Sequence, residues 1–145
     1  DENGTTIKNF NGKLKGINTI DMDSSDTFLT IAILASLVDN GITRIINISN
    51  QNVKECNRID IIYKYLLDLG VDISLQNMEL EIKGTLRELK NNLIVDTYND
   101  HRIAMSMSLL TGLVDNLIIK DYNCVTKTYP NYWLDMNNLG LHTQS

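Results

Sequence analysis

The sequence has 145 residues, of which 43% are hydrophobic and 21% charged, a composition typical of one globular domain that excludes disordered, collagen-like and coiled-coil chains. Its formal net charge of −5 argues against general binding to nucleic acids or anionic membranes. The longest apolar stretch, Phe28 to Val38, is too short for the roughly 20 residues that cross a bilayer, so we expect no membrane segment.

Strands and helices are expected to alternate along the chain. Period-two apolar patterns rich in β-branched residues predict strands, and 3.6-residue patterns predict helices. In chain order, the expected elements are strand Lys15–Met22, helix Asp26–Asp39, strand Thr43–Ile48, helix Lys54–Leu69, strands Asp72–Gln76 and Glu79–Lys83, strand Leu93–Tyr98, helix Arg102–Val114, strand Leu117–Asp121 and helix Asn131–Leu139. A weaker strand pattern lies near Thr6–Phe10, and Gly41, Gly70 and Gly140 follow three helices as left-handed caps would. This alternation favours the α/β class.

The chain also repeats itself. The sequence Leu-Val-Asp-Asn at Leu37–Asn40 recurs at Leu113–Asn116, and each copy belongs to a run of strand, helix, strand and helix. The first run continues into a two-stranded segment, Asp72–Lys83, and the second does not. We therefore expect two repeat units, at about 12–84 and 93–140, the second of which is incomplete and borrows strands from elsewhere in a longer chain.

Several kinds of site have no signal in the sequence. Cys56 and Cys124 form no CxxC pair, so we expect reduced thiols in an intracellular protein. No His and Cys cluster has metal-ligand spacing, and no Gly-rich phosphate loop is present, so we expect neither a metal nor a cofactor. No signal or transit peptide is visible.

Basic residues stand where helices are expected to begin. Lys54 and Arg58 would share one face of a first turn, where like charges four residues apart repel by a few tenths of a kcal/mol and the helix dipole adds a similar penalty. Arg102 would likewise lie in the first turn of the next expected helix, where the helix dipole disfavours a positive charge. An anion bound at such a helix start would reverse the sign of both effects.

Each of these residues also has a purely structural interpretation. Glu55 and Arg58 are then a surface pair beside a solvated Lys54. Asp26 is a helix cap or a first-turn acid, Asp100 is a helix cap, His101 is a satisfied histidine and Lys127 is a solvated loop lysine. The charged residues favour function more strongly as a group, because all lie at expected strand-to-helix junctions, where α/β folds gather their ligands. Four cations with two or three carboxylates suit a substrate that carries phosphate and carboxylate groups and reacts by acid/base chemistry.

Three motifs among these residues resemble the EPSP synthase family, the 3-phosphoshikimate 1-carboxyvinyltransferases of the shikimate pathway of aromatic amino acid and chorismate biosynthesis. They are the sequences Val53–Ile59, Tyr98–Met105 and Lys127–Pro130, in the family's order and spacing. The Lys-Glu-Cys-Asn-Arg form of the first motif is most similar to the EPSP synthase segment of the pentafunctional AROM protein. Asn52 stands where the family usually has Arg.

The resemblance implies a fold. The family has two similar domains, each built from three β-α-β-α-β-β units as an inside-out α/β barrel, with the active site between them. Residues 1–145 would form a single partial domain, with about two of the six units, from the C-terminal end. In the family, the last strands of that domain come from the beginning of the full-length chain.

The resemblance also implies a reaction and its residues. The family joins phosphoenolpyruvate to the 5-hydroxyl of shikimate 3-phosphate and releases phosphate. The implied catalytic residues are Asp26, at the 5-hydroxyl, and Glu55, at the enolpyruvyl methylene. The implied shikimate 3-phosphate contacts are Asp26, Asn50 and Lys54, the phosphoenolpyruvate contacts are Arg58, His101, Arg102 and Lys127, and Asp100 orients the latter.

Half of the implied site is missing from this sequence. The family's N-terminal domain supplies further cations and a Ser-Ser-Gln shikimate clamp, so that domain is an expected partner and the chain alone is expected to be inactive. We expect a cytoplasmic enzyme with no nucleic-acid or membrane partner. The alternatives are a non-catalytic anion-binding or scaffold module with this fold, and a relative of UDP-N-acetylglucosamine enolpyruvyl transferase, which shares the fold and chemistry.

Overall fold

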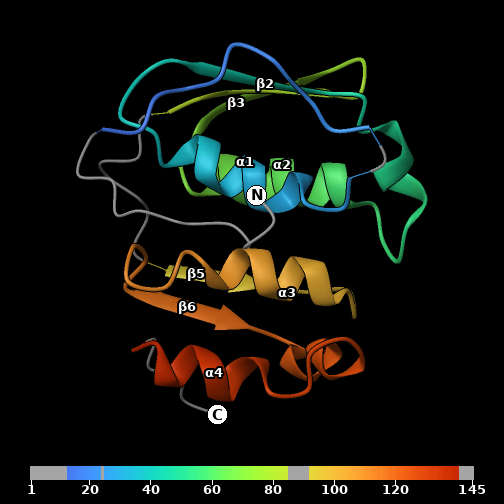
Figure 1. Ribbon diagram of the computed structural model, residues 1–145, viewed down its shortest axis with the longest axis vertical. Helices are drawn as coiled ribbons and strands as arrows, with labels where there is room; N and C mark the ends of the chain where they lie inside the picture. Colours follow the sequence, from blue (N-terminus) through green and yellow to red (C-terminus); the bar gives the residue numbers. More distant parts are fainter. Residues whose placement is uncertain (1–12, 24, 85–91, 141–145) are drawn as a thin grey trace, which may run out of the picture.

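The computed structural model describes residues 13–23, 25–84 and 92–140, arranged as stacked layers (Figure 1). The weak strand pattern near Thr6–Phe10 lies outside these residues. The first layer is a sheet with strand order β1-β2-β4-β3, formed by Ile20–Asp21, Ile42–Ile46, Glu79–Lys83 and Asp72–Gln76 in that order. Helices α1 (Phe28–Ser36) and α2 (Arg58–Asp68) lie beneath this sheet in Figure 1.

The second half of the chain forms the lower layers. Strands β5 (Asn92–Val95) and β6 (Asn116–Ile119) pair in parallel, while α3 (His101–Ser108) packs against α1. Helix α4 (Tyr132–Asn138) lies at the far end of the molecule (Figure 1). Two 3₁₀ helices, η1 (Ser49–Val53) and η2 (Tyr122–Lys127), follow β2 and β6. The expected α/β class is therefore confirmed.

The pairing in the first sheet is mixed. Strands β1 and β2 are parallel, because α1 carries the chain back between them, whereas β2–β4 and β3–β4 are antiparallel. Strands β3 and β4 form a hairpin through Asn77 and Met78, both of which have positive φ, as a two-residue hairpin turn requires. The expected bounds of these two strands, Asp72–Gln76 and Glu79–Lys83, are confirmed.

The expected helix bounds need correction. The helix expected at Lys54–Leu69 begins only at Arg58, because η1 forms first and the Asn57 side chain accepts a hydrogen bond from Asp60 N as the cap. The strand expected at Lys15–Met22 shrinks to Ile20–Asp21, and the helix expected at Arg102–Val114 covers His101–Ser108.

The remaining expected elements differ less from the structure. The helices expected at Asp26–Asp39 and Asn131–Leu139 are shorter, and the strands expected at Thr43–Ile48, Leu93–Tyr98 and Leu117–Asp121 begin one residue earlier and end two or three residues sooner. Gly70 and Gly140 follow α2 and α4 at φ of 91° and 93°, whereas Gly41, at φ 95°, lies beyond the end of α1 in the turn to β2.

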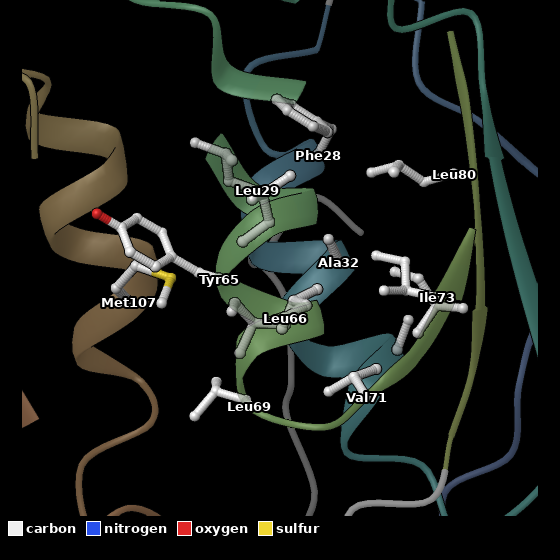
Figure 2. Packing of buried hydrophobic residues seen from close by; sticks show 14 of the residues in the cluster. Phe28, Leu29, Ala32, Tyr65, Leu66, Leu69, Val71, Ile73, Leu80 and Met107 are labelled. Carbon is white, nitrogen blue, oxygen red and sulfur yellow. The ribbon is translucent and has the colours of Figure 1, made fainter. Parts of the chain in front are cut away.

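One hydrophobic core joins both halves of the chain. Helix α1 contributes Phe28, Leu29 and Ala32, which are fully buried (Figure 2). On the other side of α2, Tyr65 lies beside Met107 of α3 in the same figure. Buried residues of both halves of the described chain thus belong to one cluster, so the packing of each half depends on the other. No helix among the described residues is long and apolar enough to cross a membrane.

A polar contact reinforces this junction. The Tyr65 hydroxyl accepts a hydrogen bond from Asp96 N at 2.8 Å and donates one to Asp96 O at 3.1 Å, which ties α2 to the segment after β5. Burial raises the pKa of Tyr65, so the hydroxyl keeps its proton at neutral pH.

We predict that Tyr65→Phe lowers the free energy of unfolding by about 1–3 kcal/mol, because it leaves Asp96 N and O without this partner in a half-buried position. Denaturant unfolding measures the change. Tyr63→Phe on the same helix is the matched control, since its hydroxyl makes no hydrogen bond to another described residue. Equal effects of the two substitutions would contradict the prediction.

Candidate active site

Four segments meet at one edge of the molecule and carry the charged residues singled out above. They are the segment just before α1, the stretch from η1 to the start of α2, the N-terminus of α3 and the end of η2. Hydrogen bonds and ion pairs join the side chains of Asp26, Lys54, Glu55, Arg58, Asp100, Arg102 and Lys127 into one network. The expected convergence of these residues is thus found.

Arg58 occupies the centre of this network. Its side chain is only 1% exposed, and its Nε and Nη2 donate to the two Asp100 oxygens at 2.7 and 3.3 Å. Nη2 also donates to Glu55 Oε2 at 2.7 Å, and Nη1 donates to Asp26 Oδ1 and to Gln51 Oε1, both at 3.1 Å. These bonds use all five N–H groups of the guanidinium.

Three more exposed cations surround the two outer carboxylates. Arg102 Nη2 lies 3.3 Å from Asp26 Oδ2, and Lys54 Nζ lies 3.5 Å from Asp26 Oδ1. Lys127 Nζ lies 3.3 Å from Glu55 Oε1. Together with Arg58 there are four cations against the carboxylates of Asp26, Glu55 and Asp100, which leaves one net positive charge. An anion would therefore be attracted to this cluster, although the whole chain is acidic.

The carboxyl groups of the cluster are held in their ionised form. Burial raises the pKa of Asp26, but the positive charges of Arg102, Arg58 and Lys54 outweigh it and lower the pKa. The pKa of Glu55 is lowered by a hydrogen bond to its own backbone N–H and by Arg58, against the effect of burial. Burial likewise raises the pKa of Asp100, and hydrogen bonds from Arg58 and from Arg102 N bring it below the usual value.

His101 faces the same carboxylates from the start of α3. Its side chain is 9% exposed, and Nδ1 lies 4.0 Å from Glu55 Oε1 and from Asp100 Oδ1 without a hydrogen-bond partner among the described residues. Burial lowers the pKa of His101 against the pull of Asp100, so the ring is neutral at pH 7.

Glu55, Asp100 and His101 place three possible metal ligands within 4.8 Å of one another. The Glu55 and Asp100 carboxylates are, however, already bound to Arg58, and Glu55 also to Lys127. A divalent cation there would have to approach two fixed positive charges at close range. The donor set therefore suits an anion better than a metal ion.

The structure corrects several sequence-based interpretations. Lys54 lies in extended backbone between η1 and α2, so the predicted repulsion between Lys54 and Arg58 on one helical face is wrong. Asp26 is not a helix cap, because Thr27 is the N-cap residue of α1 and makes no side-chain capping bond. Lys127 is 51% exposed and thus solvated, as the structural interpretation expects, but it lies at the end of η2 and also pairs with Glu55.

Other interpretations are confirmed. Asp100 caps α3 by accepting a hydrogen bond from Arg102 N at 2.9 Å, and its carboxylate also accepts hydrogen bonds from Arg58. Arg102 lies in the first turn of α3, as expected. Asn50 joins the network only indirectly, through a hydrogen bond from Gln51 Nε2 at 3.1 Å.

Two residues of the network were missed by sequence reasoning. Gln51 is fully buried against Arg58, although a glutamine between Asn50 and Asn52 gives no sign of burial. Cys56 donates from Sγ to Asp100 Oδ2 at 3.3 Å, and burial together with Asp100 raises its pKa to about 12, so the thiol stays protonated. Cys56 and Cys124 are both free, as expected.

We predict that Arg58→Leu lowers the free energy of unfolding by about 3–5 kcal/mol, because it leaves the fully buried Asp100 carboxylate without its cation. Arg44→Leu is the control. It breaks a single exposed pair with Glu81, so it should cost about 0–1 kcal/mol. Denaturant unfolding at neutral pH measures both, and similar losses would contradict the central role of Arg58.

Comparisons with known proteins agree with this fold. The sequence model of the family described as EPSP synthase (3-phosphoshikimate 1-carboxyvinyltransferase) matches residues 1–136. The chain therefore belongs to the EPSP synthase family, and the resemblance of the three motifs is confirmed.

Individual relatives include both large and small proteins. A pentafunctional AROM polypeptide of Mycosarcoma maydis is 39% identical over 138 residues, which cover 86% of this chain and 8% of that protein. A 3-phosphoshikimate 1-carboxyvinyltransferase of Clostridium beijerinckii is 37% identical over 122 residues, which cover 83% of this chain and 28% of that protein. The chain thus spans only a small part of the curated relatives that it matches.

Solved structures show the same fold. An EPSP synthase from Acinetobacter baumannii superposes with a TM-score of 0.70 at 23% sequence identity, covering 91% of this chain and 32% of that one. The similarity covers the sheet-and-helix arrangement described above and confirms the family fold for a part of the whole protein.

Proposed function

We propose that this chain is the C-terminal part of a 3-phosphoshikimate 1-carboxyvinyltransferase, which transfers the enolpyruvyl group of phosphoenolpyruvate to the 5-hydroxyl of shikimate 3-phosphate. The observation that carries the proposal is the pair of ionised carboxylates, Asp26 and Glu55, on either side of the buried Arg58 guanidinium. Family membership and the net positive charge of the cluster support it.

The reaction needs two proton transfers that a pair of carboxylates can perform. A proton adds to the methylene carbon of phosphoenolpyruvate, and the 5-hydroxyl oxygen bonds to C2 as it loses its own proton. Phosphate then leaves C2 while the new methyl group returns a proton. In this proposal Asp26 takes the hydroxyl proton, and Glu55 delivers and removes the proton at the methylene carbon.

Substrate binding would prepare these carboxylates for proton transfer. Arg102 and Lys54 pair with Asp26 and help to lower its pKa, and Lys127 pairs with Glu55 and adds a smaller lowering to the effects of the Glu55 backbone hydrogen bond and of Arg58. When the phosphate and carboxylate groups of the substrates attract these cations, the pairing weakens and the pKa of each carboxyl group rises. A carboxyl group whose pKa lies closer to the working pH can both accept and return a proton more readily.

In this proposal, the other residues of the cluster bind one substrate or the other. Arg102 and Lys127 hold phosphoenolpyruvate, with neutral His101 beside them, and Arg58, oriented by Asp100, joins them once Asp26 or Glu55 releases one of its N–H groups. Lys54 and Asn50 hold shikimate 3-phosphate together with Asp26. The three cations other than Arg58 are at least one-third exposed, as groups that meet an incoming anion should be.

The proposal also covers domain organisation. Residues 1–145 form part of one EPSP synthase-like domain, with repeat units at about 12–84 and 93–140. The match to about a third of a solved EPSP synthase supports the view that another domain supplies the opposite side of the site. On this view the isolated chain is inactive, and the full-length enzyme acts in the cytoplasm.

The direct test is to incubate the purified full-length protein with both substrates and to measure phosphate release. Turnover would support the transferase. Absence of turnover with retained binding of shikimate 3-phosphate would support the alternative of a non-catalytic anion-binding module. Turnover with UDP-N-acetylglucosamine in place of shikimate 3-phosphate would support the other enolpyruvyl transferase, against which the EPSP synthase family match already speaks.

We predict that Asp26→Asn and Glu55→Gln in the full-length protein each lower kcat by about 10²–10⁴-fold, the usual loss when a positioned acid or base is removed. Asp72→Asn is the control, because its pairing with Lys83 is exposed and 3.9 Å long. Steady-state kinetics and thermal melts separate catalysis from stability. Surviving activity combined with a lowered Tm would mean that these two carboxylates are structural.

We predict that Arg102→Gln weakens phosphoenolpyruvate binding by about 1.5–3 kcal/mol, the value of a charge-assisted hydrogen bond. The unliganded protein should keep its stability, because the Arg102 side chain is 38% exposed and its pair with Asp26 is a surface contact. Lys54→Gln should weaken shikimate 3-phosphate more than phosphoenolpyruvate. Melting curves with each ligand measure these effects, and an Arg102→Gln protein with a lower Tm but unchanged ligand shifts would refute the assignment.

A further inference from the structure

The neutral side chain of Gln51 bonds to Arg58 of the cluster just described and to two residues beside the cluster, Ser25 and Asn50. It lies in η1, and its side chain is fully buried. Its Oε1 accepts a hydrogen bond from Arg58 Nη1 at 3.1 Å. Its Nε2 donates to Asn50 Oδ1 at 3.1 Å and to the backbone oxygen of Ser25 at 3.4 Å. The oxygen and the nitrogen of the carboxamide are therefore both hydrogen-bonded.

The neighbours of Gln51 fix the orientation of this amide. Arg58 can only donate, and the Ser25 carbonyl can only accept. A flipped amide would place its NH₂ group against the guanidinium and its oxygen against the carbonyl, which loses both bonds. The glutamine thus has a single favourable orientation, and any residue without both a donor and an acceptor leaves a buried polar group unpaired.

The three partners of Gln51 have different roles in the proposed site. Arg58 is the central cation, Asn50 is a proposed contact of shikimate 3-phosphate, and Ser25 precedes the proposed base Asp26. Burial raises the pKa of Asp26, whereas Arg102, Arg58, Lys54 and the Gln51 amide lower it. These groups come from α3, α2, the stretch before α2 and η1, and Gln51 is the neutral one among them.

We propose that Gln51 is a positioning residue that holds Arg58, Asn50 and the Asp26 segment in one arrangement for the transfer reaction. This inference rests on the proposed function. Gln51 touches no substrate in it, and acts by fixing the guanidinium from the side opposite to Asp100 and by favouring the ionised form of Asp26. Its loss should therefore loosen the contact with shikimate 3-phosphate and change the pH at which Asp26 works.

The experiment compares Gln51→Met and Gln51→Glu with the wild-type full-length protein. Methionine keeps the length of the side chain but removes both bonding ends. Glutamate keeps the acceptor for Arg58, loses the donors, and adds a negative charge beside Asp26. Asn52→Ser is the matched control, because Asn52 lies in the same 3₁₀ helix and contacts Met78 and Ile59 instead of the charged cluster.

We expect Gln51→Met to raise the KM for shikimate 3-phosphate by about fivefold or more, the equivalent of one lost hydrogen bond. The acidic limb of the kcat profile should move to higher pH, because Asp26 loses a group that favours its charged form. Gln51→Glu should move this limb further, since an added negative charge raises the pKa of Asp26 again. Asn52→Ser should leave both KM and the limb at the wild-type values.

Two outcomes would overturn the inference. In one, Gln51→Met lowers only Tm and the amount of active enzyme, while KM and the acidic limb stay unchanged, which is the behaviour of a purely structural residue. In the other, Asn52→Ser changes KM and the limb as much as Gln51→Met does. Wild-type protein without turnover would refute the proposed function instead. In that case calorimetric titration with shikimate 3-phosphate tests Gln51: weaker binding by Gln51→Met than by wild type supports the inference, and equal binding overturns it.

Discussion

The buried ion pair between Arg58 and Asp100 is the contact on which the arrangement of the cluster depends. Taking both charges out of water costs several kcal/mol per ion, and only close geometry with further hydrogen bonds offsets this cost. Arg58 starts α2 and Asp100 caps α3, so the pair is satisfied only when these two helices pack in one register. The core around Tyr65 and Met107 supplies the hydrophobic part of that docking.

The same pair helps to explain how the cluster can hold so many charges. Four cations in one place would repel each other, but Asp26 and Glu55 stand between them and neutralise most of the repulsion. Asp100, fully buried, balances Arg58 permanently, whereas the outer pairs are half exposed and can exchange partners. The Arg58–Asp100 pair therefore fixes the arrangement of the cluster. The more exposed pairs of Asp26 and Glu55 leave cations that can bind an anion.

Much of the fold could be predicted from local patterns. The hairpin of β3 and β4 was located residue by residue, because apolar alternation and a two-residue turn are both visible in the sequence. The start of α2 was missed, because the helical period continues upstream of Arg58 while the backbone forms a 3₁₀ turn and an extended stretch. Periodicity reports which face is apolar, and it does not report where the first helical hydrogen bond forms.

The candidate site, too, could be predicted from the sequence only in part. Motif resemblance identified the charged residues, but it could not show that Arg58 is buried or that Asp26 is bound to it, because these contacts join residues far apart in the sequence. Gln51 was missed for the same reason, since a buried amide is recognisable only by the long-range partners that satisfy it.

The distribution of the cluster over the chain limits what this chain can do by itself. The first half of the chain contributes Asp26, Lys54, Glu55 and Arg58, and the second half contributes Asp100, Arg102 and Lys127, so neither half holds the whole cluster. Within the described residues, the exposed cations contact the carboxylates at one edge of the layers. The two substrates of the proposed reaction each carry a phosphate and a carboxylate group and would need countercharges on their other side too. The proposed second domain meets that need, because an anion bound from both sides loses more of its contact with water and gains stronger electrostatic interactions.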